Sequence, residues 1–78
     1  MGIKRIVLLG STGSIGTQAL DIVRENPDRF KVAALTCRNR IQELMKQVKE
    51  FSPEAVCVGN EESAAQVSAA FPALEVSS

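Results

Sequence analysis

The stretch GSTGSIG occupies residues 10–16 and consists of three glycines, two serines, one threonine and one isoleucine. It follows IKRIVLL, residues 3–9, whose β-branched and apolar side chains predict a strand buried on both faces. After Ser14 the apolar side chains recur with helical spacing, which predicts a helix whose buried face carries Ile15, Ala19, Ile22 and Val23. The glycine-rich stretch is therefore expected to connect a strand to a helix.

Outward from this stretch, strand-like and helix-like segments alternate. Proline marks the end of each predicted helix, at Pro27, Pro53 and Pro72, because the residue before proline is pushed out of the helical region. Asn60 is a favourable N-cap for the third helix. The predicted strands are 3–9, 31–36, 55–58 and 74–76, and the predicted helices begin at Ser14, Ile41 and Asn60. The order β-α-β-α-β-α-(β) predicts an α/β fold, a Rossmann-type doubly wound parallel sheet.

Length and composition limit the possible functions. The chain has 78 residues, and a doubly wound sheet usually continues to about five or six strands, so we expect residues 1–78 to be the N-terminal part of a longer Rossmann domain. Nine basic and nine acidic residues give no net charge, basic residues form no run, and the aromatic residues are three phenylalanines. This composition argues against a nucleic-acid partner. The apolar segments are too short to span a membrane or serve as a signal peptide, so a cytoplasmic location is expected.

Metal and nucleophile chemistry find little support in these residues. The chain has no histidine, and its two cysteines, Cys37 and Cys57, are too far apart for a CxxC motif, which argues against a zinc site. Reduced thiols are favoured over a disulfide, and both cysteines are interpreted as packing residues, with Cys57 inside a buried strand. The carboxylates fall on the polar faces of helices. No catalytic or metal-ligating residue is predicted within the chain.

The spacing GxxGxxG, in a strand–loop–helix context, is typical of a dinucleotide-binding loop. Gly10 would allow a tight exit from the strand, Gly13 a close approach of a pyrophosphate, and Gly16 close packing of the helix. The helix N-terminus would supply amides and a positive dipole end to the phosphates. Hydroxyl donors are expected from Ser11, Thr12 and Ser14. The alternative is a simple turn in which Thr12 or Ser14 caps the helix; a P-loop is excluded because the loop has no lysine.

The end of the second predicted strand indicates which dinucleotide is bound. NAD-binding proteins carry a carboxylate there for the ribose 2′-hydroxyl, whereas this chain has no acid between residues 36 and 40. Arg38 and Arg40 stand there instead, and guanidinium groups suit a 2′-phosphate in charge and in geometry. We therefore predict NADP(H), with Arg38, Asn39 and Arg40 at its 2′-phosphate end. The alternatives are that Asn39 caps the second helix and that the arginines are solvated surface charges.

With these features in place, the chain resembles the N-terminus of the 1-deoxy-D-xylulose 5-phosphate reductoisomerase family. The resemblance is carried by LGSTGSIGTQALDIVRENPDRFKVAALT, residues 9–36, and EFSPEAV, residues 50–56. It implies that Thr12, Gly13, Ser14 and Ile15 contact the cofactor diphosphate and nearby groups. Many members of the family have Ala-Gly-Lys-Asn or a similar sequence where this chain has Cys37-Arg38-Asn39-Arg40. Positive charge is retained, and the residue that meets the 2′-phosphate is left open.

The resemblance also implies an activity. Members of the family use NADPH and Mg²⁺ or Mn²⁺ to convert the phosphosugar 1-deoxy-D-xylulose 5-phosphate to 2-C-methyl-D-erythritol 4-phosphate in non-mevalonate isoprenoid synthesis, as cytoplasmic homodimers. The metal-binding carboxylates and substrate-phosphate residues of the family lie beyond Ser78, so this chain alone is expected to be inactive. Alternatives are another NADP-dependent oxidoreductase, of the semialdehyde dehydrogenase or short-chain reductase type, and a non-catalytic nucleotide-sensing domain.

Overall fold

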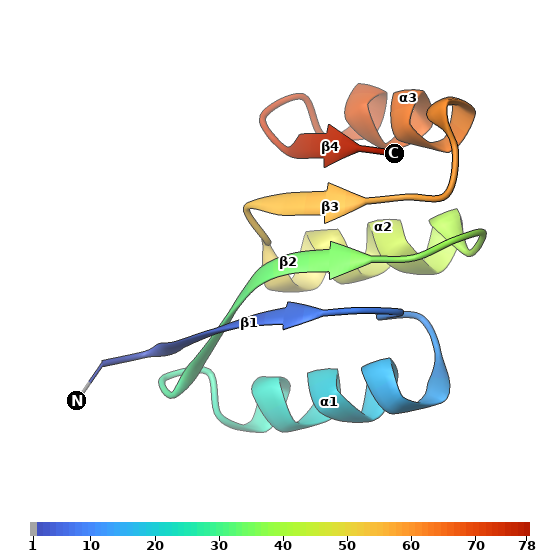
Figure 1. Cartoon of the computed structure of the whole chain (residues 1–78). Helices are drawn as coiled ribbons and strands as arrows, with labels where there is room; N and C mark the ends of the chain where they lie inside the picture. The colour runs from blue at the N-terminus through green and yellow to red at the C-terminus, as the bar shows by residue number, and fades with distance from the viewer. Residues whose placement is uncertain (1) are drawn as a thin grey trace.

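The computed structural model describes residues 2–78, in which four strands alternate with three helices (Figure 1). The order along the chain matches the sequence prediction, and the boundaries agree to within one or two residues. Each helix ends two residues before one of the three prolines. The elements are β1 Lys4–Leu8, α1 Ser14–Glu25, β2 Phe30–Thr36, α2 Ile41–Phe51, β3 Ala55–Cys57, α3 Glu61–Ala70 and β4 Glu75–Ser77.

The strands form one parallel sheet in the order β1-β2-β3-β4. Each crossover steps to the next strand in the same direction, and right-handed crossovers of this kind place their helices on one face of the sheet. In Figure 1, α2 and α3 lie behind the strands. The predicted Rossmann-type α/β fold is confirmed, and residues 2–78 form one winding direction of such a sheet. The carboxyl ends of all four strands therefore lie at the same edge.

A bulge in β2 sets which side chains face the helices. The pairing with β1 shifts between Ile6, opposite Val32, and Val7, opposite Ala34. The extra residue, Ala33, lets both Val32 and Leu35 point into the core, which a regular strand of period two would forbid. The side chains of β2 after the bulge therefore alternate with Leu35 towards the helices and Thr36 towards the opposite face.

The core lies between the sheet and the three helices. Its residues come from every element except β1 and β4, whose apolar side chains pack at its margin. The opposite face of β1 is open: the side chain of Val7 is 61% exposed, and Ile3 and Leu9 are also exposed. The prediction that β1 is buried on both faces is therefore wrong for residues 2–78. The core consists of Leu20, Val23, Val32, Leu35, Cys37, Ile41, Leu44, Val48, Val56, Val58 and Val67.

The buried face of α1 also differs from the prediction. Gly16, Leu20 and Val23 face the sheet. Ile15 and Ile22, predicted to be buried, are 84% and 55% exposed. Two apolar stripes run along this helix, and periodicity alone does not distinguish them. The stripe beginning at Gly16 is the buried one because only a glycine fits where α1 meets the loop before it.

All three helices are short, and the longest, α1, has 12 residues. Within residues 2–78, none of them has the length and apolar character needed to cross a membrane.

Candidate functional site

A hollow of about 470 Å³ opens at the carboxyl ends of the first three strands. It brings together the glycine-rich loop, the turn after β2 and the end of β3, which are separate in sequence. In parallel α/β sheets, ligands bind outside the carboxyl ends of the strands. Its lining residues are Gly10, Thr12, Gly13, Thr36, Cys37, Arg38, Cys57, Val58 and Gly59.

The loop after β1 is fixed to the end of β2 through Thr36. The Gly10 amide donates to Thr36 Oγ1 at 2.9 Å, and the Ser11 amide donates to the Thr36 carbonyl at 2.8 Å. Gly10 has φ +70°, a left-handed conformation that costs glycine little and other residues more. The predicted role of Gly10 in a tight exit from the strand is confirmed.

Ser11 faces the protein interior instead of the hollow. Its side chain is fully buried, its hydroxyl donates to Gln47 Oε1 at 2.7 Å, and its carbonyl accepts from Gln47 Nε2 at 2.8 Å. Because its amide is also bonded to Thr36, Ser11 has no free donor. The prediction that Ser11 donates a hydroxyl to the cofactor is therefore wrong, and its role is to tie the loop to α2.

The other two glycines have different surroundings. A Cβ on Gly16 would clash with the Gly10 carbonyl and lie 2.7 Å from Ser11 Cα, so no larger residue fits there without moving the backbone. A Cβ on Gly13 would meet only the Gly10 carbonyl, at 3.5 Å, an ordinary contact. Gly16 is thus required by the fold, as predicted. Folding does not require a glycine at position 13, where the space in front of the backbone is open.

The N-terminus of α1 has no side-chain cap. Gly13 is the N-cap residue, and no side chain bonds the first amides of the helix. The alternative that Thr12 or Ser14 caps the helix is therefore wrong. Within residues 2–78 the hydroxyls of Thr12 and Ser14 have no hydrogen-bond partner, and Ile15 is exposed beside them. Unpaired amides at a helix N-terminus suit an anion.

The turn after β2 presents Arg38, Asn39 and Arg40, which are all exposed. Arg38 lines the hollow, whereas Arg40 is the N-cap residue of α2. The Asn39 side chain does not cap α2, so that alternative is wrong. Among residues 2–78, neither arginine forms an ion pair; the paired arginines are Arg5 and Arg24. Both guanidinium groups are therefore available to an anion, with Arg38 the nearer to the loop.

Sequence reasoning missed Gly59, which follows β3 and lies against the Arg38 turn. A Cβ on Gly59 would lie 2.6 Å from the Arg38 carbonyl oxygen. No local pattern signals this contact, because Gly59 stands outside the GxxGxxG spacing and 21 residues after Arg38. It becomes visible only when β2 and β3 are paired.

The two cysteines occupy neighbouring strand ends but opposite faces of the sheet. Both are free. Cys37 is buried among the core residues, and burial raises the pKa of its thiol. Cys57 is exposed and lines the hollow, so the prediction that it is buried inside a strand is wrong. The difference follows from the alternation of side chains along each strand.

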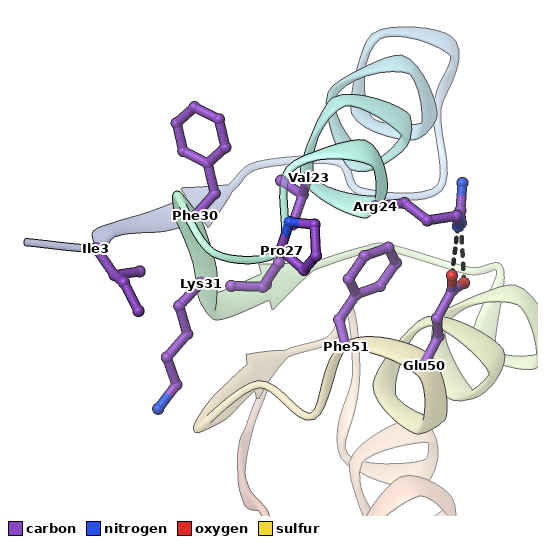
Figure 2. Close-up of a pocket in the computed structure, with 9 residues that line it drawn as sticks. Ile3, Val23, Arg24, Pro27, Phe30, Lys31, Glu50 and Phe51 are labelled. Carbon is purple, nitrogen blue, oxygen red and sulfur yellow. Dashed lines mark hydrogen bonds and ion pairs between the residues drawn. The ribbon is translucent and has the colours of Figure 1, made fainter.

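A second hollow lies at the opposite edge of the sheet, between the C-terminal ends of α1 and α2 (Figure 2). Arg24 pairs there with Glu50 and Asp21, and its guanidinium lies 5.3 Å from the centre of the Phe51 ring. The hydrogen bonds from Glu50 and Asp21 raise the pKa of Arg24, and Arg24 lowers the pKa of Glu50. These groups satisfy one another, which indicates a bridge between the helices.

Metal-binding groups are not gathered at either hollow. Among residues 2–78, no cluster of three or more histidine, cysteine, aspartate or glutamate side chains could hold a metal ion.

The fold and the hollow define a Rossmann-type α/β protein with a glycine-rich loop between β1 and α1. A family model described as 1-deoxy-D-xylulose 5-phosphate reductoisomerase matches residues 6–78, and the chain belongs to this family. The chain is 51% identical over 73 residues to the 1-deoxy-D-xylulose 5-phosphate reductoisomerase of Phocaeicola vulgatus, and 48% identical over 73 residues to that of Bacteroides thetaiotaomicron. These alignments cover 94% of this chain and 19% of each relative, so the chain spans about a fifth of their length.

Solved structures of the same family share the fold. A crystal structure of DOX-P reductoisomerase in complex with NADPH, fosmidomycin and magnesium aligns with a TM-score of 0.88 and 31% identity, over 97% of this chain and 20% of that chain. The reductoisomerase of Zymomonas mobilis in complex with NADPH aligns with a TM-score of 0.89 and 25% identity, over 99% of this chain and 21% of that chain. The resemblance seen in the sequence is confirmed.

Proposed function

We propose that this chain binds NADPH as the N-terminal part of the cofactor domain of a 1-deoxy-D-xylulose 5-phosphate reductoisomerase. The observation that carries the proposal is the uncapped N-terminus of α1, which faces the hollow at the carboxyl ends of β1–β3. Relatives of the same family were crystallised with NADPH, which supports this ligand. Family membership favours it over a semialdehyde dehydrogenase, a short-chain reductase or a nucleotide sensor.

The described residues fit the diphosphate of such a cofactor. Gly13 lines the hollow and carries no side chain that would cover its backbone, and the first amides of α1 have no side-chain partner. Thr12 lines the hollow and adds an unpaired hydroxyl. Ser14, with a second unpaired hydroxyl, and exposed Ile15 follow Gly13 in the chain and lie outside the lining of the hollow. Together with the helix dipole, these donors would orient two phosphate groups. When bound, NADPH supplies a hydride; the residues of this chain hold the nucleotide end and perform no proton transfer.

We expect the exposed arginines of the Arg38–Arg40 turn to favour the phosphorylated cofactor. No acid stands in residues 36–40 to repel a 2′-phosphate or to bind a 2′-hydroxyl. Arg38 lines the hollow itself, so it is the better placed partner, and Asn39 and Arg40 follow it in the same exposed turn. A guanidinium can bind a phosphate with two parallel hydrogen bonds.

The reaction of the whole protein follows from the family. We infer that it isomerises and reduces 1-deoxy-D-xylulose 5-phosphate to 2-C-methyl-D-erythritol 4-phosphate, for isoprenoid synthesis, with Mg²⁺ or Mn²⁺ held by residues outside this chain. A cytoplasmic homodimer is the expected assembly. Because residues 2–78 carry no metal cluster and no carboxylate lines the hollow, we expect the 78-residue chain alone to be inactive.

The proposal is tested by titrating the chain with NADPH and NADH and following the nicotinamide fluorescence. The chain has no tryptophan or tyrosine, so energy transfer and background from the protein are small. We expect saturable binding of both, with NADPH roughly tenfold tighter because one charge-assisted contact is worth about 1.5–3 kcal/mol. Absence of binding by a sample that circular dichroism shows to be folded would contradict the proposal.

Gly13→Val identifies the loop as the binding element. A valine side chain would fill the open space in front of the Gly13 backbone, so we expect NADPH binding to be lost while helix content is retained. Gly2→Val is the matched control, because a Cβ at Gly2 meets nothing within 4 Å. Unchanged affinity in Gly13→Val would place the diphosphate elsewhere.

A further inference from the structure

Gly59 is packed against the turn that carries Arg38. An added Cβ would lie 2.6 Å from the Arg38 carbonyl oxygen and 3.2 Å from both the carbonyl carbon and Cα of Arg38. All three atoms belong to the backbone, so no rotation of a flexible side chain could relieve the clash. The turn itself would have to move away from the end of β3.

The hydrogen bonds around this contact restrict where the turn could go. The Cys37 amide donates to the Cys57 carbonyl at 3.0 Å, so the end of β2 is held against β3 just before the turn. On the far side, the Ile41 amide donates to the Asn39 carbonyl at 2.9 Å, where α2 begins. Between these two points, Arg38 is the residue free to shift. A side chain at position 59 would therefore act mainly on Arg38.

A shift of the Arg38 backbone would change the position of Arg38 in the hollow. Gly59 and Arg38 both line it, as do Gly10 and Thr12 across from them. A residue that moves the Arg38 backbone also moves the start of its side chain relative to the glycine-rich loop. Since a bidentate contact with phosphate depends on geometry, such a shift would weaken a 2′-phosphate contact and leave the diphosphate contacts at α1 in place.

We propose that Gly59 is a positioning residue that sets the discrimination between NADPH and NADH by letting the Arg38 backbone lie against the end of β3. This inference rests on the proposed function. It assigns a specificity role to a strand end that lies outside the dinucleotide fingerprint. Gly59 itself offers the nucleotide no side chain and acts through Arg38.

The test is Gly59→Ala, titrated with NADPH and with NADH in the full chain. We expect NADPH affinity to fall roughly tenfold, the effect of one lost charge-assisted contact. NADH affinity should stay within about twofold, so the NADPH/NADH ratio approaches that of Arg38→Ala. In the double variant Arg38→Ala/Gly59→Ala, the second substitution should not change the ratio further. An equal loss for both nucleotides, or an unchanged ratio, would overturn the proposal.

Gly2→Ala is the matched control, because it adds a methyl group at a glycine with nothing within 4 Å. If Gly59→Ala does not fold, the test moves to Arg38→Gly/Gly59→Ala. Glycine at 38 lets the turn relax, so folding should be restored if position 59 acts through this turn. Failure of the double variant to fold would refute coupling to Arg38.

The outcomes separate this inference from the proposed function. If the unmodified chain binds neither nucleotide, the proposed function fails and Gly59 plays no part in it. If the unmodified chain prefers NADPH and Gly59→Ala keeps that preference, the proposed function stands and the role of Gly59 is refuted.

Discussion

The two edges of the sheet differ in how their polar groups are satisfied. At the edge where the strands begin, Arg24 is paired with Glu50 and Asp21, and Asn26 Nδ2 donates to the Ile22 carbonyl at 2.9 Å. At the edge where the strands end, α1 begins without a side-chain cap and Arg38 has no ion pair among residues 2–78. At the first edge the arginine is bound by carboxylates of the protein itself, and at the second edge the helix amides and the arginine are left available to a ligand.

This difference shows how to separate structural from binding groups when both lie beside a hollow. The hollow at the Arg24 edge is lined mainly by apolar side chains, and two of its charged groups, Arg24 and Glu50, bind one another (Figure 2). The hollow at the Arg38 edge is lined by backbone and small side chains, with positive charge at its rim. Unpaired donors facing open space favour a binding site, because such groups gain more from an anion than from water alone.

The largest expected effect comes from Gly16, which packs the start of α1 against the loop at the edge where the strands end. Gly16→Ala should lower the free energy of unfolding by about 3 kcal/mol, since the added methyl group meets backbone atoms of Gly10 and Ser11. Gly13→Ala should cost about 1 kcal/mol or less, because its Cβ makes only an ordinary contact. Urea unfolding followed by circular dichroism measures both. Equal losses would mean that the loop backbone is not as tightly packed as described.

A smaller loss of stability is expected from Gln47, which ties α2 to the loop. Gln47→Leu leaves the hydroxyl and carbonyl of Ser11 buried without a partner, at a cost of about 1–3 kcal/mol in the free energy of unfolding. Gln42→Leu, at an exposed position of the same helix, should change it by no more than about 0.5 kcal/mol. The midpoint of urea unfolding is the measurement. A neutral Gln47→Leu would contradict the role assigned to Ser11.

The alkylation rates of the two cysteines compare the exposed face of the sheet with the core directly. Cys57 should react with iodoacetamide roughly tenfold faster than Cys37 or more, because it is exposed while burial raises the pKa of the Cys37 thiol. NADPH should slow the reaction of Cys57, which lines the hollow. Peptide mass spectrometry after timed alkylation measures both rates. Because Cys37 also lines the hollow, the control for protection is the urea-unfolded chain alkylated with and without NADPH. Faster labelling of Cys37 would contradict the arrangement of the strand ends.

The smallest change in stability is expected at the edge where the strands begin, and it depends on pH. The hydrogen bond from Arg24 lowers the pKa of Glu50 below its ordinary value of about 4.3. The pair therefore stabilises the fold above that value, and this stabilisation is lost as the pH falls through the lower, folded-state pKa. Glu50→Gln should lower Tm slightly at pH 7, and its difference from the unmodified chain should shrink as the pH falls. The effect is small because both side chains are nearly half exposed.

Glu75→Gln on β4 is the control for this pH dependence, because Glu75 is exposed and has no ion pair among residues 2–78. Thermal unfolding between pH 3 and pH 7 gives the comparison. If the difference in Tm between Glu50→Gln and the unmodified chain grew towards pH 3, the role assigned to the Arg24–Glu50 pair would be contradicted.

Most of the site could be predicted because its signals are local. The positions of Gly10, Gly13 and Gly16 follow from a strand, a tight turn and a helix within one short stretch. The turn after β2 is located by counting along one β-α-β unit, and its arginines are then read directly from the sequence. The errors arose where a side chain had a choice of partner. Ser11 bonds Gln47, 36 residues away, and Ile15 lies on the exposed stripe of α1.

The sequence by itself determined the alternation of strands and helices, the family, and the glycine-rich loop at the start of α1. These depend on backbone propensity, chain breakers and spacing, which act over a few residues. Tertiary structure alone decided that Ser11 is buried, that Cys57 is exposed and that Gly59 lies against Arg38. Those outcomes depend on which strands pair, where the bulge at Ala33 shifts the register, and which face the helices cover. Contacts between residues far apart in the chain leave no local signal, because many sequences could satisfy each one.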